Sequence, residues 1–149
     1  MNKGKLLPPV YLLLCILLAV GLHRYAPVAT AIPRPWSFLG VGMVVLGLLM
    51  VVLPAAMFKA RGTAIKPFDE STALIEDGLY AFSRNPIYLG MIVLVLGVAV
   101  WLGSATPFVA PVLLWAILRF RFIPVEEAML ERTFGERYRA YKARVRRWL

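Results

Sequence analysis

The sequence is poor in cysteine, histidine and acidic residues. Among 149 residues, one is cysteine, one is histidine and eight are Asp or Glu. Cys15 alone can build neither a disulfide nor a zinc site from the chain's own cysteines, and we predict no metal site. No internal repeat or low-complexity segment is present, and nothing indicates a separate soluble domain. We therefore expect residues 1–149 to form a single domain.

Long apolar runs dominate the rest of the chain. Hydrophobic residues make up 60% and charged residues 17%, whereas a soluble domain has about 45–50% apolar residues. A bilayer core of about 30 Å needs about 20 residues of helix. The last of the four apolar runs is long enough to span the bilayer only if its helix carries Arg119 and Arg121 to the interface, where long basic side chains can snorkel to water. The sequence predicts an all-α integral membrane protein with four transmembrane helices, at about residues 6–22, 36–58, 87–103 and 106–122.

The basic residues are distributed unevenly between the predicted loops. The loop between the first two spans has only Arg24 and Arg34, and the turn between the last two has none. The other basic residues are Lys3, Lys5, Lys59, Arg61, Lys66, Arg84 and nine between Arg119 and Arg147. Lys and Arg favour the cytoplasmic side, so we expect both termini in the cytoplasm, with the bacterial inner membrane as the location. The net charge of +9 suits anionic lipid headgroups better than nucleic acid.

Two polar pieces are predicted at the cytoplasmic face, a loop at 59–85 and a tail at 124–149. The turn "GSATP", Gly103–Pro107, makes the last two spans a tight hairpin, so the loop and the tail meet. The tail is predicted to be an amphipathic helix that Gly135 interrupts and that lies on the inner leaflet. Its apolar stripe consists of Leu130, Phe134, Tyr138, Tyr141, Val145 and Trp148.

The stretch "SRNPIYLG", Ser83–Gly90, opens the third span. Asn85 is predicted to cap the helix and Pro86 to be its first residue. With Arg84 beside the free amides of the first turn, this helix start suits a carboxylate or phosphate. Tyr88 is expected at headgroup depth, and Gly90 permits close approach of a helix or ligand. A purely structural role, with Arg84 as a topology signal, stays open.

A pair of adjacent carboxylates begins the tail, in "PVEEAML" at residues 124–130. Acids near a helix start favour the helix dipole whatever the function. Glu126 and Glu127 diverge by about 100° around a helix, so one can face solvent while the other faces the gap beneath the hairpin. Because Arg84 and Asn85 are expected in the same gap, the site suits a ligand with both signs of charge, such as an amino acid headgroup.

These two motifs together resemble the isoprenylcysteine carboxyl methyltransferase family and the related phospholipid methyltransferases. The pattern is Arg-Asn-Pro-x-Tyr-x-Gly from Arg84, followed after the hairpin by Glu-Glu from Glu126 and by Phe-Gly-x-x-Tyr-x-x-Tyr from Phe134. The similarity covers about residues 77–147. The family usually has His where this chain has Asn85, which weakens any role that needs a titrating imidazole.

The resemblance implies S-adenosylmethionine as the methyl donor, without a metal. Carried over by position, the donor-binding residues are Arg84, Asn85, Tyr88, Gly90, Glu126 and Glu127. Tyr80, in the approach to this motif, is a further candidate, for the adenosine side. Glu127 and Arg121 are the expected catalytic residues, with Arg121 orienting an anionic acceptor.

The predicted function is S-adenosylmethionine-dependent methylation of a lipophilic acceptor at the cytoplasmic membrane face. The reactive group is a carboxylate, thiol or amine, and the acceptor is a lipophilic small molecule or a lipid-anchored substrate among membrane lipids. Two alternatives stay open, a non-catalytic membrane scaffold and an NADPH-dependent reductase of the sterol type. Binding of the donor or of NADPH discriminates between them.

Overall fold

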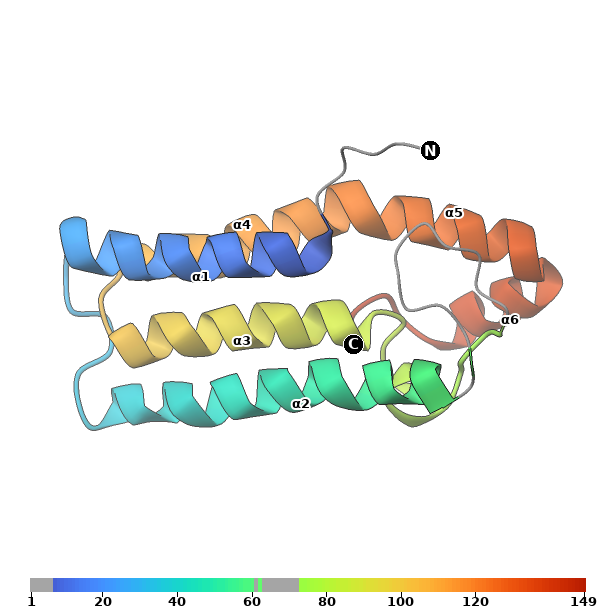
Figure 1. Ribbon diagram of the computed structural model, residues 1–149, viewed down its shortest axis with the longest axis horizontal. Helices are drawn as coiled ribbons and strands as arrows, with labels where there is room; N and C mark the ends of the chain where they lie inside the picture. The colour runs from blue at the N-terminus through green and yellow to red at the C-terminus, as the bar shows by residue number, and fades with distance from the viewer. Residues whose placement is uncertain (1–6, 61, 63–72) are drawn as a thin grey trace.

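The computed structural model describes residues 7–60, 62 and 73–149, and all regular elements within them are helical. Figure 1 shows the long helices side by side, with α6 across one end of the bundle. The elements are α1 (Pro8–Tyr25), η1 (Trp36–Phe38), α2 (Leu39–Ala60), η2 (Gly78–Ala81), α3 (Pro86–Leu102), η3 (Thr106–Phe108), α4 (Val109–Ile117), η4 (Leu118–Phe122), α5 (Ile123–Phe134) and α6 (Glu136–Arg144).

Three helices in the described part of the chain are long and apolar enough to cross a membrane: Pro8–Tyr25, Trp36–Phe58 and Thr106–Phe134. The third predicted span is the shorter apolar helix α3, of 17 residues. Large hydrophobic side chains such as Leu17, Leu49 and Val112 remain exposed on the outside of the bundle. Such a surface suits lipid rather than water, and the chain is an integral membrane protein.

Helices α2 and α3 approach closely through glycines spaced seven residues apart. A Cβ added at Gly47 would lie 2.7 Å from the Gly90 carbonyl oxygen, and one at Gly97 would lie 2.8 Å from the Gly40 oxygen. Backbones come this near only where no side chain separates them. The close approach predicted at Gly90 is confirmed, and its partner is a helix of the same chain.

The predicted break between the fourth span and the tail at Pro124 is wrong. The helix continues from Thr106 to Phe134. Proline removes a backbone donor and normally breaks the α-helical ladder. Here Leu118–Phe122 forms a π-helical turn, in which the Ile123 N–H donates to the Leu118 carbonyl. This wider turn accommodates Pro124, so both glutamates extend from the end of a long helix.

The tail stripe packs inside the protein, which corrects its predicted place on the leaflet surface. Tyr138 and Tyr141 are 1% and 2% exposed and form a core cluster with Leu74 and Val145. The loop before α3 therefore covers the face that was expected to meet lipid. The predicted interruption at Gly135 is confirmed, since it separates α5 from α6 with φ +51°.

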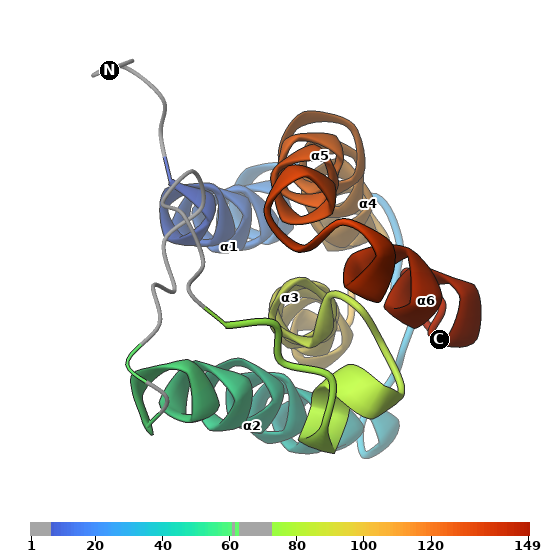
Figure 2. The same cartoon turned by 90° about the vertical axis from the view of Figure 1, so that its right-hand side faces the viewer.

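The predicted hairpin and the meeting of loop and tail are confirmed. Helix α3 ends at Leu102, followed by Gly103 in the left-handed conformation, and the chain turns back into α4. Figure 2 shows the segment before α3 and helix α6 beside the start of α3. His23 lies at the opposite end of the bundle, where its Nδ1 is 2.8 Å from Ser104 Oγ. Several basic residues used to predict orientation lie outside the described residues: Lys3, Lys5, Arg61, Lys66 and the side chain of Lys59.

Candidate functional site

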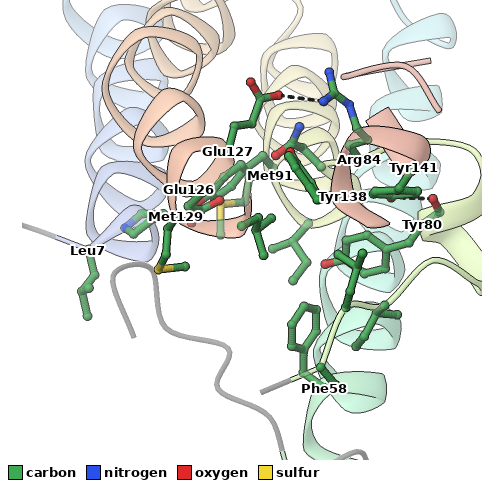
Figure 3. A pocket seen from close by; sticks show the side chains of 18 of the residues that line it. Leu7, Phe58, Tyr80, Arg84, Met91, Glu126, Glu127, Met129, Tyr138 and Tyr141 are labelled. Carbon is green, nitrogen blue, oxygen red and sulfur yellow. Dashed lines mark hydrogen bonds and ion pairs between the residues drawn. The ribbon is translucent and has the colours of Figure 1, made fainter. Parts of the chain in front are cut away.

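A cavity of about 260 Å³ lies where the start of α3 meets the loop before it, α5 and α6. Figure 3 shows side chains from all of these elements pointing into it. Its polar lining consists of Tyr80, Arg84, Asn85, Tyr88, Glu126, Glu127, Tyr138 and Tyr141. Its apolar lining consists of Leu7, Pro8, Pro9, Phe58, Ala73, Leu74, Ile75, Ile87, Met91, Met129 and Leu130.

Arg84 is a buried guanidinium with unused hydrogen-bonding capacity. Its side chain is 9% exposed, and Nη1 lies 3.3 Å from Glu127 Oε1 (Figure 3). Neither Nε nor Nη1 has a hydrogen-bond partner among the described residues. Buried donors are nearly always satisfied, so Nε, which has no acceptor among the described residues, and Nη1, which has only the ion-pair contact with Glu127, have capacity for a further acceptor.

Glu127 lies between two arginines. Arg147 donates to it from Nε at 2.9 Å and from Nη2 at 2.5 Å, in the two-bond geometry that a guanidinium forms best. With Arg84, two positive charges share one buried carboxylate. Burying an uncompensated charge is costly, and an anionic group in the cavity would offset it.

Glu126 has a different environment from its neighbour. Tyr88 donates a hydrogen bond of 2.5 Å from its hydroxyl to Glu126 Oε1. No ion pair to Glu126 occurs among the described residues, so its carboxylate retains the capacity to bind a cation. The two glutamates diverge around α5, as their spacing predicted, yet both line the cavity.

Asn85 precedes α3, but its side chain does not cap the helix, which corrects that part of the prediction. Pro86 is the first helical residue, as predicted. The Asn85 amide Nδ2 donates instead to the Arg147 carbonyl, at 3.0 Å. Asn85 therefore ties the helix start to the tail.

Tyrosines from two segments close one side of the cavity. The Tyr141 hydroxyl donates to the Tyr80 carbonyl at 2.7 Å (Figure 3). Burial, together with the nearby Glu127, raises the pKa of Tyr138 to about 12. Burial also raises the pKa of Tyr80 well above its usual range. With their pKa raised, Tyr80 and Tyr138 stay neutral at physiological pH.

The structure brings six of the predicted site residues around this cavity: Tyr80, Arg84, Asn85, Tyr88, Glu126 and Glu127. Two others lie elsewhere. Gly90 packs against Gly47 and Met50 of α2. Arg121 is exposed, with its guanidinium 5.7 Å from the Tyr11 ring.

Neither the apolar lining nor the contact of Arg147 with Glu127 was predicted from the sequence. Nothing distinguishes Arg147 from the other basic residues of the tail, because its contact with Glu127 depends on how the chain folds back. Tyr138 and Tyr141 stood in the quoted motif, and their spacing was the available signal for a contact with the site.

The family model of phospholipid methyltransferase matches residues 36–137, which include most of the site. The chain belongs to the phospholipid methyltransferase family. The predicted resemblance is thereby confirmed, and membership supports a membrane methyltransferase.

Two curated proteins are similar to parts of the chain. An uncharacterised protein of Haemophilus influenzae is 35% identical over 63 residues, which is 42% of this chain and 100% of that protein. Protein-S-isoprenylcysteine O-methyltransferase of Schizosaccharomyces pombe is 36% identical over 73 residues, or 48% of this chain. The match spans only 30% of the yeast protein.

The fold is similar to that of a solved structure, the eukaryotic intramembrane Ras methyltransferase named isoprenylcysteine carboxyl methyltransferase. The TM-score is 0.68 at 21% sequence identity, covering 97% of this chain and 52% of the other. At this identity the likeness shows the fold. This chain thus corresponds to about half of that larger enzyme.

Proposed function

We propose that the protein is an S-adenosylmethionine-dependent methyltransferase that acts on a lipophilic acceptor at the cytoplasmic membrane face. The observation that carries the proposal is the buried Arg84, whose Nε and Nη1 lack hydrogen-bond partners among the described residues, in a cavity that also contains two glutamates.

The residues present fit the methionine end of this donor. Arg84 would bind its carboxylate, since Nε and Nη1 of the guanidinium have no hydrogen-bond partner among the described residues. Glu126 would bind its ammonium group, because this carboxylate accepts a hydrogen bond from a neutral phenol and has no ion pair among the described residues. Glu127, already held by two arginines, would fix Arg84. When bound, the donor supplies an activated methyl group, and the chain contributes binding, orientation and exclusion of water.

The apolar side of the cavity favours a lipophilic acceptor. In Figure 3, Leu7, Phe58 and Met129 lie on the side of the cavity away from the Arg84–Glu127 pair. An apolar chain here would be buried next to the donor site. Carboxylate, thiol and amine acceptors all suit this arrangement, as do lipid-anchored substrates. Arg121 stays a proposed contact for an anionic acceptor that approaches from outside the cavity.

The positive-inside rule supports the proposed location. The cavity shares its end of the bundle with the tail, which carries most of the described basic residues. We infer that this end faces the cytoplasm of a bacterial inner membrane, that α3 also crosses the membrane, which makes four crossings, and that both termini lie on the same side.

Calorimetric titration of the purified protein in detergent tests the proposal. S-adenosylmethionine and NADPH are titrated separately into wild type and into a Glu126→Ala, Glu127→Ala double variant. Glu136→Ala is the matched control, because Glu136 is a carboxylate 87% exposed on α6. We expect S-adenosylmethionine to bind wild type and the control but not the double variant. Binding of NADPH instead would favour a reductase, and a folded wild type that binds neither would favour a scaffold.

A further inference from the structure

The segment after α6 turns back across the start of α3. The Arg84 backbone N–H donates to the Arg146 carbonyl at 3.0 Å. The neighbouring carbonyl of Arg147 accepts from Asn85 Nδ2 at 3.0 Å and from Ser83 Oγ at 3.4 Å. The main chain of the tail is thus fixed to the residues on both sides of Arg84. These bonds to backbone oxygens do not depend on any tail side chain.

This backbone attachment brings the Arg147 side chain to Glu127. Arg147 forms two hydrogen bonds, one to each carboxylate oxygen. Arg84 makes a single ion-pair contact at 3.3 Å to the same carboxylate. A two-bond pair is stronger and more directional than one contact. The orientation of Glu127 is therefore set by Arg147 rather than by Arg84.

The arrangement has a consequence for ligand binding. Without Arg147, the Glu127 carboxylate is free to form its own two-bond pair with Arg84. That pair would use the donors that now lack acceptors and would neutralise the buried charge within the protein. A ligand carboxylate would then have to displace Glu127 before it could bind.

We propose that Arg147 is a positioning residue: it keeps Glu127 from pairing fully with Arg84 and so keeps the Arg84 guanidinium available to the carboxylate of a bound ligand. The inference rests on the proposed function, because the carboxylate is that of S-adenosylmethionine. It concerns an arginine beyond residues 36–137, which the family model matches, and assigns it no contact with the ligand.

The first test compares two ligands by calorimetry, S-adenosylmethionine and its decarboxylated analogue. Arg147→Ala should weaken S-adenosylmethionine binding about tenfold, the scale of one charge-assisted hydrogen bond. It should leave the affinity for the decarboxylated analogue unchanged. Arg147→Lys keeps the positive charge but lacks the planar guanidinium fork, so its affinity for S-adenosylmethionine should fall between those of wild type and Arg147→Ala. Arg146→Ala, at an exposed neighbour, should match wild type.

If Arg147 had only a structural role, Arg147→Ala would weaken the binding of both ligands alike, and that result would overturn the proposal. If Arg147→Ala fails to fold, Arg147→Lys decides: wild-type affinity for S-adenosylmethionine would overturn the role of the fork. Weaker binding of S-adenosylmethionine by Arg147→Lys, with unchanged binding of the decarboxylated analogue, would support the role of the fork.

A double-mutant cycle with Glu127→Gln gives the second test. Glutamine cannot neutralise Arg84, so Arg147→Ala should have no further effect in that background. An equal loss in both backgrounds would show that Arg147 acts independently of Glu127 and would overturn the inference. Failure of wild type to bind S-adenosylmethionine would instead overturn the proposed function itself. Binding by wild type with no effect of Arg147→Ala on either ligand would overturn this inference alone.

Discussion

At the residue scale, the site depends on differences between side chains of the same type. Glu126 and Glu127 are adjacent, but one accepts a hydrogen bond from a phenol and the other pairs with two guanidiniums. Arg84 and Arg147 also differ, since only Arg84 has buried nitrogens without hydrogen-bond partners in the described part of the chain. Roles are therefore assigned by contacts rather than by residue type.

Arg84→Ala should weaken S-adenosylmethionine binding roughly 10- to 100-fold, because a charge-assisted hydrogen bond contributes about 1.5–3 kcal/mol. Lysine at this position should recover only part of the loss, since it lacks the planar fork. Calorimetry in detergent measures both variants. Unchanged affinity in Arg84→Ala would show that Arg84 does not bind the donor.

Tyr88→Phe tests the partner of Glu126. Loss of the phenol leaves the carboxylate without this hydrogen bond, so its position becomes less defined. We expect roughly 3- to 10-fold weaker donor binding, the scale of a neutral hydrogen bond of about 1 kcal/mol. Tyr25→Phe, at a phenol 87% exposed at the other end of α1, is the control and should bind as wild type does.

At the scale of elements, the α2–α3 pair fixes the start of α3. A Cβ at Gly47 would lie 2.5 Å from the Leu94 nitrogen, whereas one at Gly42 meets nothing within 4 Å. Gly47→Ala should therefore destabilise the protein by about 1–3 kcal/mol, as overpacking does. Gly42→Ala, on the same helix, should not. Thermal unfolding in detergent compares the two, and equal melting temperatures would contradict the packing argument.

The junction between α5 and α6 depends on one backbone conformation. Gly135 has φ +51° and ψ −123°, and a Cβ there would meet no other atom within 4 Å. Alanine would be strained at these backbone angles, which should destabilise the protein by about 1–3 kcal/mol. Gly135→Ala should lower the melting temperature and weaken donor binding, since α6 supplies Tyr138 and Tyr141. Gly21→Ala, with similar open space but ordinary helical angles, should do neither.

At the scale of the whole molecule, the two ends of the bundle should face different compartments. In a Cys15→Ala background, Arg146→Cys places a thiol beside the cavity and Val28→Cys places one at the opposite end, both at exposed positions. We expect an impermeant thiol reagent to label Arg146→Cys only from the cytoplasmic side and Val28→Cys only from the other side. The reverse pattern would invert the proposed orientation.

The sequence alone determined the membrane class, the order of the helices and six polar residues of the candidate site. Apolar runs specify helices in lipid because every backbone polar group must be satisfied within the segment. The start of α3 at Pro86 and the break at Gly135 were also predictable, since proline and glycine restrict or extend local backbone angles. Such features depend on neighbours in sequence.

Only the tertiary structure decided what the polar residues contact. The π-helical turn at Leu118–Phe122 carries the helix past Pro124, and the tail stripe packs on the loop rather than on lipid. Arg147 reaches Glu127 across 20 positions of sequence. Local periodicity shows that a face is apolar or that a side chain is charged. Which surface covers that face, and which charge meets that side chain, depends on chain segments that only folding brings together.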